Sequence, residues 1–545
     1  MTAEATTDPV PSANRAWPTQ VGLPAAALLA LALAFRLPAL DAFLNIDAGW
    51  QWFRRTAHFW AAIADGQWAE TYQVHPGVTL MWLSGLALKA GPGLGGAVTP
   101  AMVAAGALPV ALVSSLIAPG TFLLWRRLGP GLHGPALLAG ALLATEPFLV
   151  GHGRTMHLDA LLTTFAWLGV LLSLGALRTG RRQTALPAGV LLALAVLTKV
   201  AGGAVALGVG LVGLAGLVRP GRGRRFWVLV TLTSVALATT WVLWPALWVA
   251  PLDTLERLLA GVTGEVDRGH RVYFDGAYHA ADPGPAYYLA VLQARVSPEV
   301  LVAAVVGVGV VAWPRGGHLS TGGRALGSAF LAYSILLGAQ ILAAKKIDRY
   351  VLPFFPLLCV AAGHGFWAVS ERLRRAVQGR PTFGPRAVQW ALALPLLGLL
   401  GPRITRLVAL HPHPIAWAAD WPGRPAGHAI TLGFGEGLRE AALWIAEDAG
   451  GQRVRLFSGM YRPCLEPWLA SRESSMANAE YILRYISVVQ RGFRAREYRL
   501  EMRGLLHEVV LDGRVYAEIH AGPAYRGPTH PGLSMPWPAP PKAMP

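Results

Sequence analysis

The chain has 545 residues, of which 54% are hydrophobic and only 14% are charged, and its mean hydropathy is +0.42. A soluble protein of this length would carry more charge, so the composition excludes the soluble class. The net charge of +17 comes from arginine runs between apolar stretches, and not from one basic face with interleaved aromatic residues, which excludes a nucleic-acid-binding protein.

About eleven apolar stretches can each supply the roughly 20 helical residues that cross a bilayer core. They lie near 21–41, 103–125, 134–151, 158–177, 184–200, 202–218, 226–247, 293–313, 325–343, 350–369 and 387–401. The first stretch follows a tail with Arg15, and its Ala-Leu-Ala at 32–34 is compatible with a cleaved signal peptide. We favour a retained helix, because the apolar run continues past that site and an acidic residue follows it. The sequence therefore predicts a polytopic α-helical membrane protein.

Basic residues fall in every second loop of this arrangement. The runs lie at 126–127, 178–182, 219–225, 315–324 and 372–386. The positive-inside rule places these loops and the N-terminal tail 1–20 in the cytoplasm, and the C-terminus outside the cell membrane. The transmembrane module then spans 21–401, and 42–102, 248–292 and 402–545 face outward. We expect the functional groups in these outer segments.

The outer segments contain secondary structure of their own. Apolar residues at helical spacing in 47–67 predict either an interfacial helix or a simple connecting helix. The piece 75–88 is apolar but too short to span, which favours a re-entrant or interfacial helix. From 435 onward a helix ends at two glycines, and "RVRLF", "HEVVL" and "RVYAEIH" alternate as strands do, which predicts a small C-terminal α/β domain. We expect the Pro-rich end after Arg526 to be disordered.

Acidic and basic residues gather near the predicted outer helix ends. Asp47 in "NIDAGW" is either a functional acid or a helix N-cap. "GRTMHLDALLTTF" brings Arg154, His157 and Asp159 within two helical turns, where they either serve a site or only neutralise and pack against one another.

Lysine is rare in this arginine-rich chain and occurs only at 89, 199, 345, 346 and 542. Lys199, Lys345 and Lys346, together with Arg349, lie at predicted outer helix ends, where the positive-inside rule disfavours them. An anionic partner such as a lipid-linked phosphate explains this placement, and snorkelling to lipid headgroups is the alternative.

The second long outer segment carries His270 in a stretch rich in His, Asp and Tyr, from 265 to 288. No spacing typical of metal ligands appears there, so we expect contacts to carbohydrate or to lipid headgroups, and no metal. P-loop, GxSxG and CxxC motifs are missing, and no GxGxxG follows a strand, which argues against an ATP-driven pump, a serine hydrolase and a dinucleotide enzyme. An activated substrate must then supply the energy for a reaction.

Over residues 25–370 the chain resembles the GT-C superfamily, and within it the protein O-mannosyltransferase and aminoarabinose transferase group of glycosyltransferase family 39. The resemblance is carried by motifs in the expected order: "NIDAGWQW", "HPGVTLMWL" with His75, "GRTMHLDALLTTF", "AVLTKVAG", "LWPALWVAPLDTL" and "KKIDRYVLPFFPLLCVAAG" with Tyr350. One departure is Ala48, where many relatives have the second acid of an Asp-Glu pair; this puts substrate positioning in doubt and not the base.

The resemblance implies an inverting glycosyltransferase that moves a hexosyl or pentosyl group from a polyprenyl-phosphate donor to a hydroxyl of a protein, lipid or glycan. It implies that Asp47 is the catalytic base, with no cofactor, nucleotide or metal at the site. The leaving phosphate would contact Lys199, Lys345, Lys346, Arg349 and Tyr350. Supporting positions would be His75, Arg154, His157, Asp159 and His270.

Two other classes of protein remain possible from the sequence. A transporter or flippase of polyprenyl-linked sugars would also bind phosphate between helices, but it would favour internal repeats and interrupted helices at the membrane midplane, which the sequence does not show. A non-catalytic assembly protein would not need so many helices with outward-facing acids and bases. The C-terminal domain contains no residue pattern typical of catalysis, which favours a role in acceptor recruitment.

Overall fold

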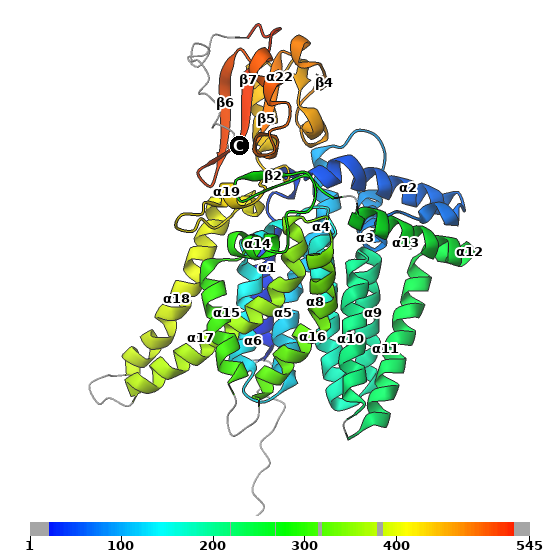
Figure 1. Cartoon of the computed structure of the whole chain (residues 1–545), viewed down its shortest axis with the longest axis vertical. Helices are drawn as coiled ribbons and strands as arrows, with labels where there is room; N and C mark the ends of the chain where they lie inside the picture. The colour runs from blue at the N-terminus through cyan, green and yellow to red at the C-terminus, as the bar shows by residue number, and fades with distance from the viewer. Residues whose placement is uncertain (1–20, 219, 268, 314–318, 379–384, 528–545) are drawn as a thin grey trace, which may run out of the picture.

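The computed structural model describes residues 21–218, 220–267, 269–313, 319–378 and 385–527. The predicted tail 1–20, most of the Pro-rich end and parts of three basic loops lie outside these ranges. A bundle of long helices carries a small α/β domain at one end (Figure 1). The predicted fold class, a helical membrane protein with a C-terminal α/β domain, is confirmed.

Each predicted apolar stretch contains a helix. The bundle consists of α1 Leu23–Arg36, α4 Pro100–Ser115, α5 Ile117–Trp125, α6 His133–Thr145, α7 Pro147–His152, α8 Asp159–Thr179, α9 Arg182–Thr198, α10 Ala201–Gly216, α11 Arg222–Leu243, α14 Tyr287–Arg295, α15 Pro298–Ala312, α16 Thr321–Leu342, α17 Phe355–Gln378 and α18 Pro385–Ala409. In the described ranges, 6 helical segments are long and apolar enough to span a membrane, or up to 7 if the bent pair α14 and α15 forms one span. The count of eleven therefore stays a prediction.

Helix α8 lies at the centre of the bundle and is buried along nearly its whole length. Its polar residues are accommodated because hydroxyls donate to carbonyls four residues earlier, as Thr163 does to Asp159 and Ser173 does to Gly169. The N-terminal helix α1 packs closely against α6, since a Cβ on Gly140 would lie 2.7 Å from a methyl of Leu28. The first helix is thus an integral part of the bundle.

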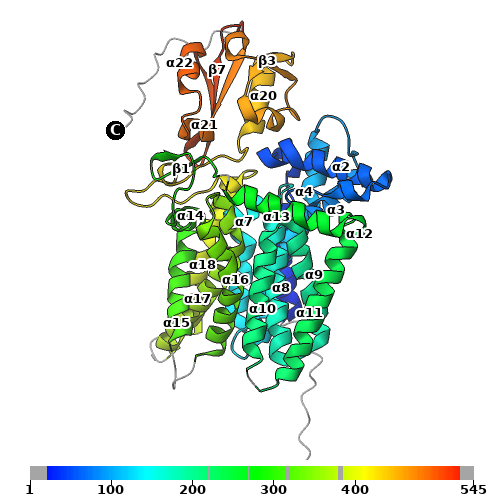
Figure 2. The same cartoon turned by 45° about the vertical axis from the view of Figure 1, so that its right-hand side comes forward.

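Shorter elements cover the end of the bundle that faces the C-terminal domain. They are the 3-10 helix η2 Leu40–Ala42, the π-helix η3 Ala48–Trp52, α2 Phe53–Ala64, η4 Trp68–Thr71, α3 Val78–Ala90, α12 Ala246–Val249, α13 Pro251–Asp267, the hairpin of β1 Val272–Phe274 and β2 Ala277–His279, and η6 Asp348–Phe354. Helices α2 and α13 run across the bundle end and not along the bundle axis (Figures 1 and 2). Both are amphipathic, as the sequence predicts for an interfacial helix in 47–67.

The C-terminal domain is built on a five-stranded mixed sheet of order β4-β3-β5-β7-β6. Its elements are η7 Pro414–Ala416, α19 Ala426–Ala429, α20 Leu438–Asp448, β3 Val454–Phe457, η8 Gly459–Cys464, β4 Ser471–Glu473, η9 Met476–Asn478, β5 Tyr481–Tyr485, α21 Ile486–Gln490, α22 Ala495–Glu501, β6 Gly504–Leu511 and β7 Arg514–Ala521. Strands β4, β3 and β5 are parallel, and β5, β7 and β6 are antiparallel. The predicted helix and three strands correspond to α20, β3, β6 and β7.

The C-terminal domain contacts the first outer segment directly. The backbone N–H of Ile46 donates to the carbonyl of Phe434 at 3.0 Å, and Nε1 of Trp50 donates to the carbonyl of Met460 at 2.7 Å. Gly435 has φ +123°, and a Cβ there would lie 2.6 Å from the carbonyl oxygen of Leu44, so only glycine fits this contact. The segment that carries Asp47 is thereby held between the helix bundle and the domain.

Candidate active site

Asn45 fixes the backbone that presents Asp47. Its Nδ2 donates to Oγ1 of Thr155 at 2.6 Å and to the carbonyl of Met156 at 3.3 Å, and its Oδ1 accepts from the N–H of Ala48 at 2.8 Å. Although Asp47 precedes η3, its side chain makes no capping hydrogen bond. The carboxylate therefore does not act as an N-cap and points toward other groups.

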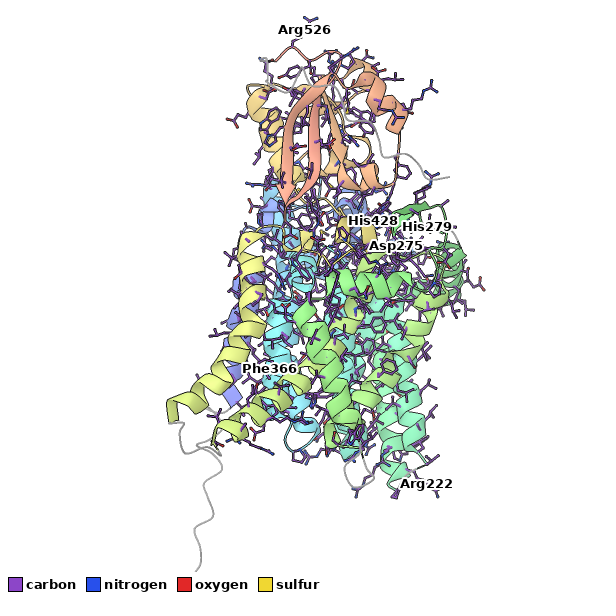
Figure 3. The ribbon with its side chains drawn as sticks, turned by 60° about the vertical axis from the view of Figure 1, so that its left-hand side comes forward. Arg222, Asp275, His279, Phe366, His428 and Arg526 are labelled. Atoms are coloured by element: carbon purple, nitrogen blue, oxygen red, sulfur yellow. The ribbon has the colours of Figure 1, made fainter. Side chains whose placement is uncertain are left out.

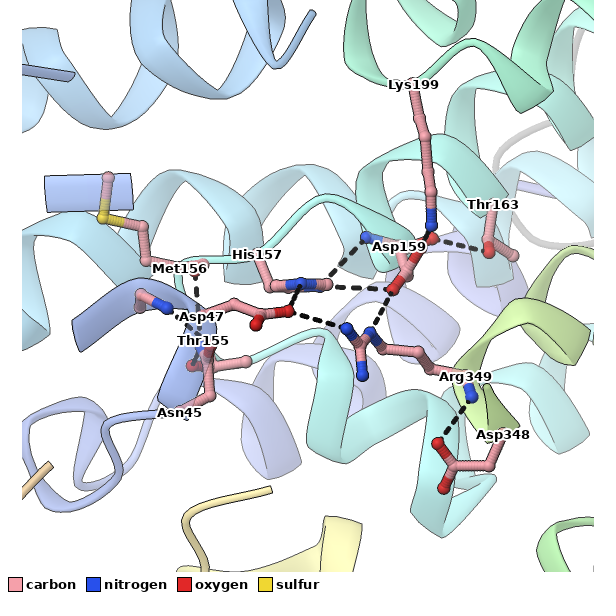
Figure 4. Close-up of polar contacts among 11 residues, drawn as sticks. Asn45, Asp47, Thr155, Met156, His157, Asp159, Thr163, Lys199, Asp348 and Arg349 are labelled. Carbon is pink, nitrogen blue, oxygen red and sulfur yellow. Dashed lines mark hydrogen bonds and ion pairs between the residues drawn. The ribbon is translucent and has the colours of Figure 1, made fainter. Parts of the chain in front are cut away.

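Asp47 belongs to a cluster of five ionisable side chains drawn from separate parts of the chain (Figure 4). Its Oδ2 lies 2.7 Å from Nη2 of Arg349 and 3.0 Å from Nε2 of His157. Asp159 lies 3.3 Å from Nδ1 of His157, 3.2 Å from Nε of Arg349 and 2.7 Å from Nζ of Lys199. Arg349 and His157 thus each lie between the two carboxylates. Below, these five residues are called the charged cluster.

Electrostatics keep Asp47 ionised. Burial by itself would raise the pKa of this carboxyl group, but the charge of Arg349 and the hydrogen bond from His157 outweigh burial, and the pKa of Asp47 lies well below its ordinary value. Asp159 is almost fully buried, and a carboxylate in that position is tolerable only because Lys199 and Arg349 compensate its charge.

On one side of the charged cluster is an apolar cavity of about 240 Å³ between α8, α10 and α16. Hydrophobic side chains such as Leu162 and Leu336 form most of its wall. Its polar groups include His75, Asp159, Lys199, Tyr288, Gln340, Lys345 and Tyr350. Nζ of Lys199 lies 4.0 Å from the centre of the Tyr350 ring. This cavity can hold a long apolar molecule with an anionic end.

On the other side is a polar cavity of about 290 Å³ between the helix bundle and the C-terminal domain. Its lining includes Asp47, Trp50, Gln51, His270, Tyr287, Arg295, Lys345, Lys346, Asp348, Arg349, Phe434, Tyr461 and Arg491. Lys345 lines both cavities. The charged cluster therefore stands where the apolar and the polar cavity approach each other.

Comparison with known proteins supports a fold but gives no sequence relative, since the sequence matches no family model and no curated protein. Two structures of the oligosaccharyltransferase of Archaeoglobus fulgidus are similar, both at 13% identity. The one tethered to an acceptor peptide has a TM-score of 0.52, and the match covers 92% of this chain and 74% of that chain. The one with an inhibitory peptide and a dolichol-phosphate has a TM-score of 0.50, and the match covers 90% of this chain and 74% of that chain. ArnT of Cupriavidus metallidurans bound to undecaprenyl phosphate is also similar (15% identity, TM-score 0.49, 95% and 100%). The chain has a GT-C fold.

Within this GT-C fold, most of the predicted site residues come together. Asp47, His157, Asp159, Lys199 and Arg349 form the charged cluster. The apolar cavity is lined by His75, Lys345 and Tyr350, and the polar cavity by His270 and again by Lys345. Burial, together with the charges of Arg491 and Lys345, lowers the pKa of His270 to about 4.

Arg154 is a predicted residue that the GT-C fold does not bring to the cluster. Its guanidinium donates to the carbonyls of Phe35, Pro38 and Ala39 and contacts Nδ1 of His411. Arg154 does not contact Asp47, and its predicted supporting role stays a prediction. Arg154 instead holds the end of α1, because the helix leaves carbonyls there without intrahelical partners.

Lys346 has two partners within the protein. Its side chain is fully buried, and its Nζ donates to Oδ1 of Asp282 at 2.7 Å and to the carbonyl of Ala343 at 2.6 Å. It lines only the polar cavity, whereas its neighbour Lys345 reaches both cavities. Lys346 thus fixes the loop before η6 through these contacts, and its predicted contact to a donor phosphate stays a prediction.

Sequence reasoning missed three residues that support Arg349. Asp348 accepts from the N–H of Arg349 at 2.7 Å, and it also accepts from Nη2 of Arg295 at 2.7 Å. The Arg349 guanidinium lies 4.6 Å from the centre of the Phe434 ring. Asp348 could have been found as the acid beside Arg349 in "KKIDRY", but nothing in the sequence links Phe434 in the C-terminal region to that motif.

Proposed function

We propose that the chain is an inverting glycosyltransferase that moves a sugar from a polyprenyl-phosphate donor to a hydroxyl group of an acceptor. One observation carries this proposal: an ionised aspartate and two cations lie between an apolar cavity and a polar one. A lipid-linked sugar needs an apolar site for its chain and a polar site for its acceptor, with a base and cations where the two meet. The complex of the similar oligosaccharyltransferase with a dolichol-phosphate is consistent with such a donor.

The donor would occupy the apolar cavity. Its isoprenoid chain would pack against side chains such as Leu162 and Leu336, while its phosphate would lie near Lys199, Lys345 and Tyr350. Lysine binds phosphate as a point charge, and Arg349 adds a planar fork that can bind two oxygens. A donor bound in this way would have the bond between its sugar and its phosphate beside the charged cluster.

Transfer needs one base and no general acid. The acceptor oxygen attacks the anomeric carbon and gives its proton to the Asp47 carboxylate, while the bond from that carbon to the phosphate oxygen breaks and its electron pair stays on the oxygen. The products are the glycoside with inverted configuration, polyprenyl phosphate and protonated Asp47, which then releases its proton to water. Because phosphate is a good leaving group, cations suffice to stabilise it, in contrast to the two-carboxyl scheme of glycoside hydrolysis.

A carboxylate with a low pKa is a weak base, and movement of Arg349 would make Asp47 a stronger one. Arg349 bridges Asp47 and Asp159. A donor phosphate would compete for the guanidinium, and as Arg349 turned toward the phosphate the pKa of Asp47 would rise. The carboxylate would then become a stronger base only when the donor is bound.

The charges of the two bundle ends support an extracytoplasmic active site. The basic loop that contains Arg222 lies at the end of the bundle opposite the C-terminal domain (Figure 3). The cluster residues Lys199 and Arg349 lie at the domain end, where Lys199 contacts Asp159 and Arg349 contacts Asp47. By the positive-inside rule the active site and the C-terminal domain face outward from the cell membrane.

Release of polyprenyl phosphate tests this function directly. The purified protein in lipid nanodiscs would be incubated with radiolabelled polyprenyl-phosphate hexoses and pentoses plus host membranes. The wild type and Asp41→Asn, a control just before the first outer segment and outside the cluster, should release polyprenyl phosphate, and Asp47→Asn should not. Equal release by Asp47→Asn would exclude the mechanism, and specific donor binding without any release would favour a transporter.

A further inference from the structure

Arg491 of the C-terminal domain lines the polar cavity without a protein partner. It follows α21, and its Nε is buried, yet among the described residues none of its side-chain nitrogens makes a hydrogen bond or an ion pair. Other partly buried arginines of the domain are paired: Arg484 with Glu518 at 3.0 Å and Arg514 with Asp420 at 2.6 Å. A buried guanidinium nitrogen without a partner costs free energy, which an anionic ligand would offset.

The whole polar cavity carries an excess of positive charge. Its lining includes two carboxylates, Asp47 and Asp348, and five cationic residues: Arg295, Lys345, Lys346, Arg349 and Arg491. Both carboxylates are already bound, Asp47 by Arg349 and Asp348 by Arg295, and Lys346 is bound by Asp282 from outside the lining. The cavity is thus electrostatically suited to an anion.

This anion site belongs to the acceptor side. Arg491 lines the polar cavity together with Asp47, but it does not line the apolar cavity that contains Lys199. The polar cavity also shares Trp50 with a third, open cleft of about 680 Å³, which lies between α2, the 94–98 loop and η8 of the C-terminal domain. An acceptor can therefore approach Asp47 past Trp50 without crossing the donor cavity.

Building on the proposed function, we propose that the acceptor carries an oxyanion, phosphate or carboxylate, which Arg491 binds while a hydroxyl of the same molecule reaches Asp47. A guanidinium suits this task because its fork binds two oxygens of a phosphate or a carboxylate at once. Arg491 is then a specificity residue that the C-terminal domain contributes to a site in the helix bundle.

Equilibrium binding of small hydroxylated probes tests Arg491 without any need for the donor. Full-length protein in nanodiscs would be titrated with glucose 6-phosphate, glucuronate and uncharged glucose. The variants are Arg491→Gln, Arg491→Lys and the control Arg494→Gln, whose exposed guanidinium lies 5.5 Å from the Phe457 ring and does not line the cavity. Thermal melting of each variant would confirm that it is folded.

The wild type and Arg494→Gln should bind at least one anionic probe more tightly than glucose. Arg491→Gln should weaken that binding by roughly tenfold to a hundredfold, the range for hydrogen bonds to charged groups, and Arg491→Lys should weaken it less. Preference for glucose 6-phosphate or for glucuronate would distinguish a phosphate from a carboxylate acceptor. Equal binding of glucose and both anions by the wild type, or an unchanged affinity in Arg491→Gln, would overturn the proposal. Because no sugar is transferred, failure of the glycosyltransferase assay would not affect this result.

Discussion

Arg349 donates from Nη2 to Oδ2 of Asp47 at 2.7 Å, across a separation of 302 residues in the chain. The same guanidinium contacts Asp159 at 3.2 Å through Nε. One side chain from the start of η6 therefore joins the first outer segment to the central helix α8.

Asp47→Asn should lower the rate of polyprenyl phosphate release by about a hundredfold to ten-thousandfold, the usual contribution of a general base. Asp47→Glu keeps the carboxylate but displaces it, so an intermediate rate is expected. The measurement is single-turnover release with a saturating donor. A variant Asp47→Asn that binds donor normally and reacts at the wild-type rate would contradict the assignment.

The acid limb of the pH profile should respond to Arg349. Arg349 and His157 hold the pKa of Asp47 below its ordinary value, so the carboxylate stays ionised as the pH falls to about 4, the ordinary aspartate range. Arg349→Gln removes the main stabilising charge and should move the acid limb of kcat/KM to higher pH, since that quantity reports the free enzyme. An acid limb that stays in place in the variant would show that Arg349 does not control Asp47.

Arg349→Lys should lower the activity even though it keeps the positive charge. A lysine ammonium cannot bind both carboxylates with the geometry of the guanidinium fork, so release should fall by roughly tenfold to a hundredfold. The matched control is Arg257→Lys, because Arg257 forms an exposed pair with Asp253 on α13 and lies outside the cluster. Wild-type rates for Arg349→Lys would indicate that only charge matters at this position.

Substitution of the neighbouring Lys345 and Lys346 should have different effects, the first on donor binding and the second on stability. Lys345→Met should raise KM for the donor, because Lys345 lines both cavities. Lys346→Met should chiefly lower the thermal midpoint, since it removes the buried partner of Asp282. Donor titrations and thermal melting of both variants distinguish these effects, and a reversed pattern would contradict the positions assigned to the two side chains.

Arg403 on α18 forms a buried ion pair, and we expect its mutation to destabilise the protein. Nη1 of Arg403 lies 2.7 Å from Oε2 of Glu146, and both side chains are fully buried. Arg403→Met leaves Glu146 uncompensated and should lower the free energy of unfolding by about 3–5 kcal/mol. The double variant Arg403→Met/Glu146→Leu should recover much of this loss, as measured by thermal melting, and a double variant as unstable as Arg403→Met alone would argue against charge burial as the cause.

The sequence predicts the helices well because apolar runs of about 20 residues usually form helices that span a membrane. It also predicts all five residues of the charged cluster, since Asp47, His157, Asp159, Lys199 and Arg349 all lie near helix ends on one predicted side of the membrane. Arg154 also lies near a helix end on that predicted side, but its side chain turns toward the end of α1, where it donates to backbone carbonyls. Such choices between neighbouring partners depend on distances that no single sequence contains.

The contribution of the C-terminal domain could not be predicted for a different reason. Phe434 and Arg491 reach the site only through packing between segments hundreds of residues apart, and this packing has no local periodicity. The short strands β4 and β5 were missed because β4 has only 3 residues, and β5, "YILRY", is buried on both faces and does not alternate.

The contact of Ile46 and Trp50 with Phe434 and Met460 has a consequence for biosynthesis. The segment that carries Asp47 leaves the ribosome long before its partners Phe434 and Met460 do. During synthesis the aspartate is therefore present long before the structure that positions it. An immature chain whose C-terminal domain has not yet folded would therefore lack the contacts that position the segment around Asp47.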